Sequence, residues 1–250
     1  AAYTYVTSGA VEALQARVAL VKGDWKTAST KAVSVINSHK YSLATPENYA
    51  EMWSDDVSTE TILQPIQTPT ELGGTYDGLY QDKSGLSAYY IPTYGALAIY
   101  GDGDIRFDAF FTDYSNLTVS GSVYPAMAFN KYPGNTALRT TSDNNFANMI
   151  KVFRLSEMYL ISAEADARMG NNNPARLNEF CANRYSGYET QTYDNAQKLL
   201  DEVLVERDKE FIGEGMRWSD LRRLNIGFDR YKSNPDEDGY DIYKYVVKAA

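Results

Sequence analysis

The sequence predicts a mainly α-helical single domain spanning residues 1–250, in which two helical regions flank a long irregular segment. Apolar residues recur at helical spacing over residues 1–40 and again over residues 151–250. The intervening residues 41–150 are rich in Gly, Pro, Ser, Thr, Asn and Tyr, with only short periodic signals, so a few short strands are expected there. A spacing of small residues in the first helical region also occurs in the last.

Residues 1–40 are predicted to form a helical hairpin. Gly23 supplies a helix stop, and Asp24 can cap the helix that follows and ends between Asn37 and Lys40. The first helix is indicated by an apolar stripe at helical spacing: Val11, Leu14, Val18 and Val21. The second carries one apolar face: Trp25, Ala28, Ala32, Val35 and Ile36.

Residues 41–150 contain four shorter signals. Residues 46–53 fit a short helix, and residues 59–67 fit a strand whose Pro65 favours an edge position. Asp104 is placed to cap a helix through Phe107 and Phe110, and residues 119–131 fit a strand or hairpin. Since irregular segments of this length are more often functional than accidental, this region is the expected ligand-binding region.

Residues 151–250 return to helical periodicity. Helices are expected from Val152 to Gly170, from Pro174 through Cys181, over residues 195–211 and over residues 218–225. A further segment begins at residue 242.

The two predicted hairpins share a spacing of small residues. Gly23 and Ala28 follow Ala16 by seven and twelve residues, and the second hairpin repeats these spacings: Ala163, Gly170 and Ala175. A small residue in each helix allows close crossing, which is the pattern of a tetratricopeptide hairpin. At least three such repeats normally stack, so two distant hairpins indicate a split solenoid or missing repeats.

Composition excludes several classes of function. The net charge of −9 disfavours nucleic acid as a partner. No apolar run approaches the roughly 20 residues that a membrane span requires. Cys181, the single cysteine, is expected to be a packing residue, and His39, the single histidine, a surface residue at a helix end. No metal site or cofactor is expected, because residues 101–104 lack the spacing of a calcium loop and one His with one Cys cannot make a usual zinc site.

Paired carboxylates could serve a helical glycoside hydrolase, but ion pairing explains them better. The best candidates are Glu157, Glu164, Glu206 and Glu210. Each lies among or near arginines, which favours interhelical ion pairs: Arg154, Arg168, Arg207, Arg217, Arg222 and Arg223. The chain is therefore predicted not to be an enzyme.

Tyrosine is unusually abundant in the composition, with 21 residues. A tyrosine ring offers a flat apolar face that can stack on a sugar, and it loses little entropy on binding. Five tyrosines of the irregular segment are the predicted ligand contacts: Tyr76, Tyr80, Tyr89, Tyr90 and Tyr94. Tyr100 and Tyr114 belong to the same cluster, and about half of the cluster is expected to fill space beneath the loops.

Two motifs in the last helical region resemble signatures of the SusD/RagB family. Residues 154–165, RLSEMYLISAEA, are similar to its helix R-L-x-E-x-Y-L-x-x-A-E-A. Residues 206–223, ERDKEF followed by GMRWSDLRR, are similar to its second signature. Shorter matches extend the resemblance over nearly the whole chain: Gly23-Asp24-Trp25, residues 49–53, residues 60–63, residues 104–106 and Lys131-Tyr132. The family motifs are structural, so their charged residues are expected to join the helices: Arg154, Glu157, Glu164, Arg207, Glu210, Arg217 and Asp220.

The resemblance implies an outer-membrane lipoprotein on the cell surface that captures a glycan, or a peptide, for a TonB-dependent SusC-like transporter. It also implies that this chain is the C-terminal portion of such a protein, truncated at both ends, with the lipid anchor in the missing N-terminal part. The alternative function is a tetratricopeptide-type adaptor that binds a protein or peptide.

Overall fold

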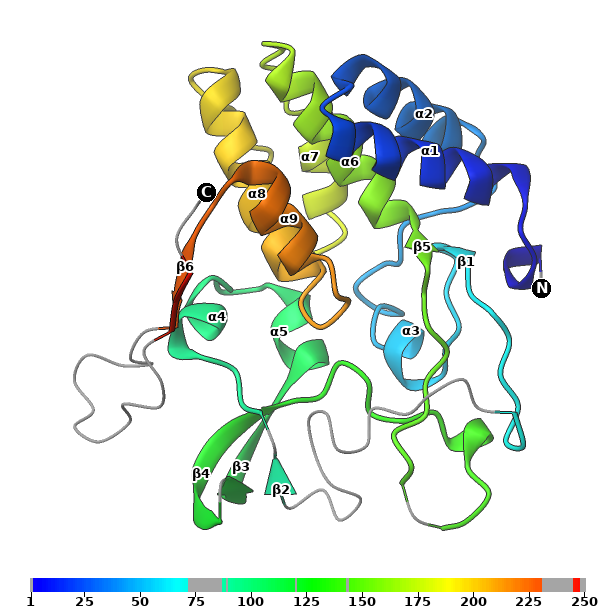
Figure 1. Ribbon diagram of the computed structural model, residues 1–250, viewed down its shortest axis with the longest axis vertical. Helices are drawn as coiled ribbons and strands as arrows, with labels where there is room; N and C mark the ends of the chain where they lie inside the picture. The colour runs from blue at the N-terminus through cyan, green and yellow to red at the C-terminus, as the bar shows by residue number, and fades with distance from the viewer. Residues whose placement is uncertain are drawn as a thin grey trace.

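The computed structural model describes residues 2–71, 87–88, 90–119, 121–142, 144–230 and 245–247. Figure 1 shows a group of helices in the upper part of the molecule, above a region of short helices, strands and loops. The upper group contains α1 (Ser8–Lys22), α2 (Trp25–Asn37), α6 (Leu155–Arg168), α7 (Ala175–Cys181), α8 (Ala196–Glu210) and α9 (Arg217–Leu224). The predicted fold class, mainly α-helical with a few short strands, is confirmed, and so are the four predicted helices after residue 150.

The hairpin α1–α2 forms as its turn chemistry predicts. Gly23 ends α1 with φ +74°, a left-handed conformation that costs a glycine little. The side chain of Asp24 accepts a hydrogen bond from the backbone N–H of Thr27 at 3.1 Å and so caps α2. Ala16 and Ala28 are both fully buried, which confirms that this hairpin crosses at small residues.

The apolar stripe that indicates α1 is not the buried face of that helix. Its members are 45–51% exposed: Val11, Leu14, Val18 and Val21. The buried face consists mainly of alanines, with Leu20: Ala10, Ala13, Ala16 and Ala19. Because close helix contact requires small side chains, α1 turns its alanines toward α2 and α6 and leaves its larger residues outside.

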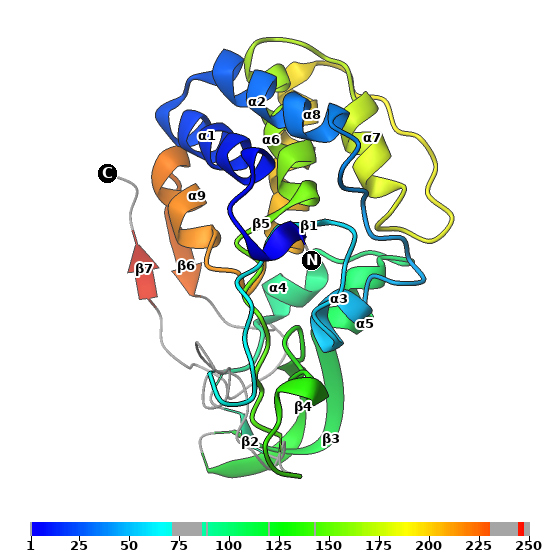
Figure 2. The ribbon, with the colours of Figure 1, turned by 90° about the vertical axis from the view of Figure 1, so that its right-hand side faces the viewer.

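Helix α6 lies at the centre of the helical group, where Figures 1 and 2 both place it among α1, α2, α7 and α8. Twelve of its fourteen residues are buried, as expected for a helix that is packed on all sides. The second predicted hairpin, α6–α7, turns at Gly170 with φ +86°. Ala163 is buried, but Ala175 is exposed, so the prediction that it forms a close crossing is wrong. Ala175 is the first residue of the seven-residue α7, which packs through Leu177, Phe180 and Cys181 instead.

Residues 41–150 hold more regular structure than the sequence predicts. The helix expected over residues 46–53 is the single turn α3 (Glu51–Ser54). The expected strand over residues 59–67 shortens to β1 (Thr61–Leu63), which pairs antiparallel with β5 (Phe153–Arg154). Farther along lie α4 (Tyr94–Ala98) and α5 (Ile105–Phe110), with Asp104 as the predicted N-cap of α5. The 3-10 helix η2 (Thr136–Leu138) also lies in this part, whereas a second 3-10 helix, η1 (Ala2–Thr4), precedes α1.

A three-stranded sheet occupies the bottom of the molecule in Figure 1. Its order is β2 (Ser87–Ala88), β3 (Phe111–Val119) and β4 (Ser122–Phe129), with β2 parallel and β4 antiparallel to β3. The predicted hairpin is therefore present, but its first strand begins at Phe111 rather than near Val119. A second two-stranded sheet, β6 (Phe228–Arg230) with β7 (Tyr245–Val247), lies in the C-terminal part.

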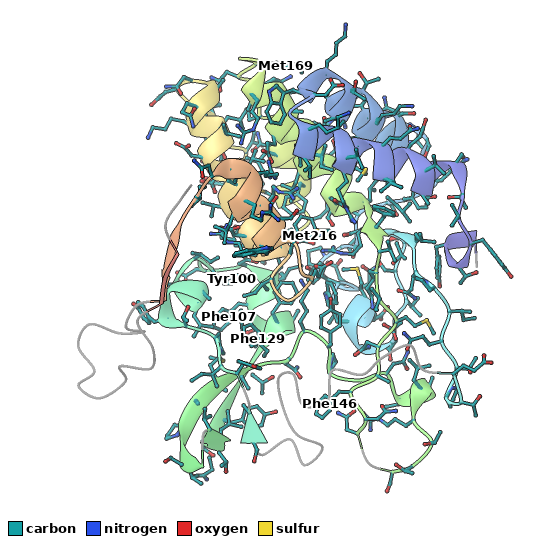
Figure 3. The ribbon with its side chains drawn as sticks, viewed as in Figure 1. Tyr100, Phe107, Phe129, Phe146, Met169 and Met216 are labelled. Atoms are coloured by element: carbon teal, nitrogen blue, oxygen red, sulfur yellow. The ribbon has the colours of Figure 1, made fainter. Side chains whose placement is uncertain are left out.

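An aromatic core joins this sheet to the helical group. Figure 3 shows Tyr100, Phe107 and Phe129 gathered between α9 and the β3–β4 hairpin. The rings of Tyr100 and Phe107 lie 6.0 Å apart at their centroids, and those of Phe111 and Phe129 lie 5.6 Å apart. The first pair packs edge-on and the second at a tilt of 44°, and these contacts, with that of Tyr100 on Phe111, join α5 and the segment that follows α4 to the β3–β4 hairpin.

Candidate functional site

A buried network of ionised side chains joins the helical group to the region below it. Its centre is Glu210 at the end of α8, whose carboxylate contacts Arg154 Nη1 at 2.7 Å and Arg184 Nε at 2.9 Å. Glu60 accepts from the same two arginines at 2.6 and 2.8 Å. All four side chains are at most 1% exposed. Arg154 ends β5 at the start of α6, Arg184 follows α7, and Glu60 directly precedes β1. The network therefore ties these three segments to the end of α8.

The arginines keep these buried carboxylates ionised. Burial alone would raise the pKa of Glu210, but Arg184, Arg154 and Arg106 hold that pKa well below its ordinary value. Glu60 behaves in the same way: Arg184 and Arg154 outweigh its burial, and its pKa is lowered. A general acid needs the opposite shift, toward neutrality, to carry a proton at the working pH.

The other candidate glutamates are also engaged in ion pairs. Glu206 contacts Arg106 Nη2 at 2.8 Å and accepts from Tyr185 at 2.5 Å. Glu164 lies 2.5 Å from Arg223 and 2.9 Å from Arg168, and Glu157 lies 2.6 Å from Arg17. These contacts confirm the prediction that the four glutamates are paired with arginines.

The charged residues of the two family motifs form the expected contacts. Arg207 lies 3.1 Å from Asp220 and joins α8 to α9, and Arg217 pairs with Asp208 at the surface. The sequence did not single out Arg184 or the partnership of Arg106 with Asp104, at 2.7 Å. No local signal identifies Arg184, because its partners Glu60 and Glu210 lie 124 and 26 residues away in the chain.

The predicted packing and capping residues also stand where the sequence places them. Cys181 is 4% exposed, and burial raises the pKa of its thiol well above the ordinary value. His39 is exposed at the end of α2. Asp104 accepts hydrogen bonds from Arg106 on both carboxylate oxygens. Within the described ranges, no cluster of three or more His, Cys, Asp or Glu residues is arranged to hold a metal ion.

The predicted ligand tyrosines divide into two groups. Tyr90 and Tyr94 are 58% and 54% exposed and lie before and at the start of α4, where Thr93 caps the helix. Tyr76, Tyr80 and Tyr89 lie outside the described residues. Of the five predicted ligand tyrosines, Tyr90 and Tyr94 are thus the two that the structure describes, and both are exposed.

Tyr100 and Tyr114 serve the packing beneath that surface. Tyr100 donates a hydrogen bond to the backbone oxygen of Lys209 at 2.8 Å and packs edge-on against Phe111. Tyr114 is partly buried against the small apolar core of the three-stranded sheet. Of the four described tyrosines in the cluster, two are thus exposed and two fill space, as the sequence predicts.

The described residues combine a buried ionic network with exposed aromatic side chains. A fixed scaffold carries exposed aromatic residues on a loop and a short helix, and its buried carboxylates are held ionised by arginines. None of the helices in the described part of the chain combines the length and apolar character needed to cross a bilayer.

A comparison with family models and a comparison with solved structures point to the same protein family. The family model described as "SusD family" matches residues 120–248, just over half of the chain. A SusD superfamily protein from Bacteroides thetaiotaomicron is 26% identical, with a TM-score of 0.75 over 92% of this chain and 52% of that structure. A SusD-like carbohydrate binding protein from Bacteroides vulgatus is 22% identical, with a TM-score of 0.70 over 91% of this chain and 47% of that structure.

A third solved structure, surface glycan-binding protein A from Bacteroides uniformis, shares the fold at 19% identity, with a TM-score of 0.60 over 88% of this chain and 50% of its own length. The chain thus spans about half the length of the solved structures that it matches. No curated protein matches the chain.

Proposed function

The chain belongs to the SusD family, and we propose that it is part of a non-catalytic protein that captures a glycan at the cell surface. In this proposal the glycan passes to a TonB-dependent SusC-like transporter in the outer membrane, on whose extracellular face the protein resides. Two of the similar structures are named as carbohydrate- or glycan-binding proteins, and one of these as a surface protein.

The observation that carries the proposal is the contrast between the buried carboxylates and the exposed tyrosines. The glutamates that could catalyse glycoside hydrolysis are at most 1% exposed and bound to arginines. Tyr90 and Tyr94 are open to solvent, and a sugar ring can stack on their faces without any chemical step.

The proposal is tested with the double variant Tyr90→Ala/Tyr94→Ala in affinity electrophoresis against a panel of polysaccharides. Each lost stacking contact is worth about 1 kcal/mol, so the dissociation constant for the retarding glycan should rise about tenfold or more. Tyr5→Ala is the matched control, because Tyr5 is 75% exposed but lies in the N-terminal segment. Unchanged retardation of the double variant would place the site elsewhere.

The alternative function, a protein- or peptide-binding adaptor, is favoured by one observation. The stripe of α1 defined by Val11, Leu14, Val18 and Val21 is an exposed apolar face of a kind often found at protein contacts. An adaptor would bind a partner protein with no affinity for saccharides, whereas the proposed function requires retardation by a polysaccharide.

A further inference from the structure

A pocket of about 410 Å³ lies beside η1, away from the exposed tyrosines of α4. It is formed by the start of the chain, the segment that follows α2 and the segment that leads into β1: Tyr3, residues 39–42, residues 57–59 and Thr61. In Figure 1, η1 lies at one side of the molecule and α4 lies toward the other. The volume falls in the range of about 300–1,000 Å³ typical of small-molecule sites.

Two half-buried tyrosines supply the apolar surface of this pocket. Tyr3 and Tyr41 both line it. Tyr41 is held by its hydroxyl, which lies 3.4 Å from Thr7 Oγ1, and the backbone oxygen of Tyr3 accepts a hydrogen bond from Gln64 at 2.9 Å. The hydroxyl contact holds the ring of Tyr41, and the backbone hydrogen bond fixes the main chain at Tyr3, so both residues lose less entropy when a ligand binds.

Polar groups surround these rings. Ser42 and Thr59 are joined by two hydrogen bonds, from Ser42 N to Thr59 O and from Thr59 Oγ1 to Ser42 O, each 3.1 Å long. Ser58 Oγ accepts from the backbone of Glu60 and keeps its own proton to donate. Thr61, which is 2% exposed, has a buried hydroxyl with no hydrogen-bond partner in the described structure.

The charge of the pocket is opposite to that of the chain. Among the residues that the structure describes, Lys40 and His39 line it and no carboxylate does, although the chain carries a net charge of −9. Lys40 is exposed and forms no ion pair with any residue that the structure describes. An ammonium group beside hydroxyls and aromatic rings is suited to a ligand that combines a carboxylate, hydroxyl groups and an apolar face.

We propose that this pocket is a second saccharide site that binds an acidic sugar residue of the hexuronate class. The carboxylate of the sugar lies at Lys40, its apolar face stacks on Tyr3 or Tyr41, and its hydroxyls bond the serine and threonine side chains. The inference rests on the proposed function, since it takes the ligand to be part of a glycan.

The test compares D-glucuronate with D-glucose, which differ only in carrying a carboxylate or a hydroxymethyl group at C5. In amide NMR spectra of the ¹⁵N-labelled chain, glucuronate should shift the signals of Ser42, Ser58 and Thr59, and glucose should shift them weakly. Lys40→Glu should weaken glucuronate binding by about tenfold or more, because it replaces a charge-assisted contact with repulsion. Lys26→Glu makes the same charge change at an exposed position of α2 outside the pocket and should leave binding unchanged.

Equal responses to the two sugars, no response of these three amides, or full affinity in Lys40→Glu would overturn the inference. The proposed function is judged separately. A chain that polysaccharides retard, but whose pocket does not respond to glucuronate, keeps the proposed function and loses the second site. A chain that no polysaccharide retards loses the proposed function even if glucuronate shifts the pocket amides.

Discussion

Glu210→Gln should destabilise the fold more than a surface substitution can, because Glu210 is the centre of the buried charge network. The carboxylate lies between Arg154 and Arg184 with its side chain fully buried. Glutamine preserves the shape of the side chain but removes the charge. Its amide nitrogen also brings a donor toward guanidinium groups that can only donate.

The expected loss follows from the charges that remain. Removing one partner of a buried ion pair costs about 3–5 kcal/mol, because the other charge stays buried and uncompensated. Glu60 still pairs with both arginines in the variant, and Glu214 contacts Arg154 at 2.7 Å. The loss should therefore lie near the lower end, at about 3 kcal/mol, out of a typical total of about 5–15 kcal/mol for a domain.

Urea unfolding followed by circular dichroism measures this change. With a slope of about 3 kcal/mol per M, the midpoint should fall by about 1 M. Arg217→Gln is the control, since Arg217 is 52% exposed and its pair with Asp208 should contribute less than about 1 kcal/mol. If the urea midpoint of Glu210→Gln falls no further than that of Arg217→Gln, the buried network does not hold the two parts of the fold together.

Two further predictions concern the effect of low pH on stability and the turn at Gly23 between α1 and α2. The folded chain lowers the pKa values of Glu60, Glu206 and Glu210 below their ordinary value of 4.5. As the pH falls through that value, the unfolded chain therefore binds more protons than the folded chain, and the free energy of unfolding should decrease. An unfolding midpoint that stays constant from pH 6 to pH 3 would contradict this. Gly23→Ala should cost about 1 kcal/mol, because Gly23 has φ +74°, and a melting temperature equal to that of the parent chain would count against it.

The helices could be predicted well from the sequence because the caps and turns that begin and end them depend on nearby residues. The caps of α2 and α5 and the left-handed glycines after α1 and α6 all follow from side chains or backbone angles within a few residues. The buried face of α1 could not be predicted in this way. Periodicity identifies a helix, but the face that it buries depends on how closely the partner helix approaches, and here alanines permit the approach.

The strand β3 shows a second limit of local patterns. Only Phe111, Leu117 and Val119 of its nine residues are buried. The pairing of β3 with β4 shifts register between Tyr114 and Leu117, which interrupts the alternation of buried and exposed residues along the strand. Strict alternation is lost at such a bulge, so the sequence gives no clear strand signal before Val119.

The candidate site was predictable in composition but not in arrangement. The sequence indicated that the glutamates are paired with arginines and that part of the tyrosine cluster is exposed. It could not indicate that Glu60 and Arg184 meet, or that Tyr3 and Tyr41 line one pocket, because residues far apart in the chain come together only through the packing of the helices.

The central claim, glycan capture without catalysis, is tested most directly by affinity electrophoresis of the chain against a panel of polysaccharides, with each gel assayed for released sugar. We expect retardation by at least one glycan and no released product. Release of sugar from a retarding glycan would contradict the structural role of the buried glutamates, and the absence of retardation by any polysaccharide would contradict glycan capture itself.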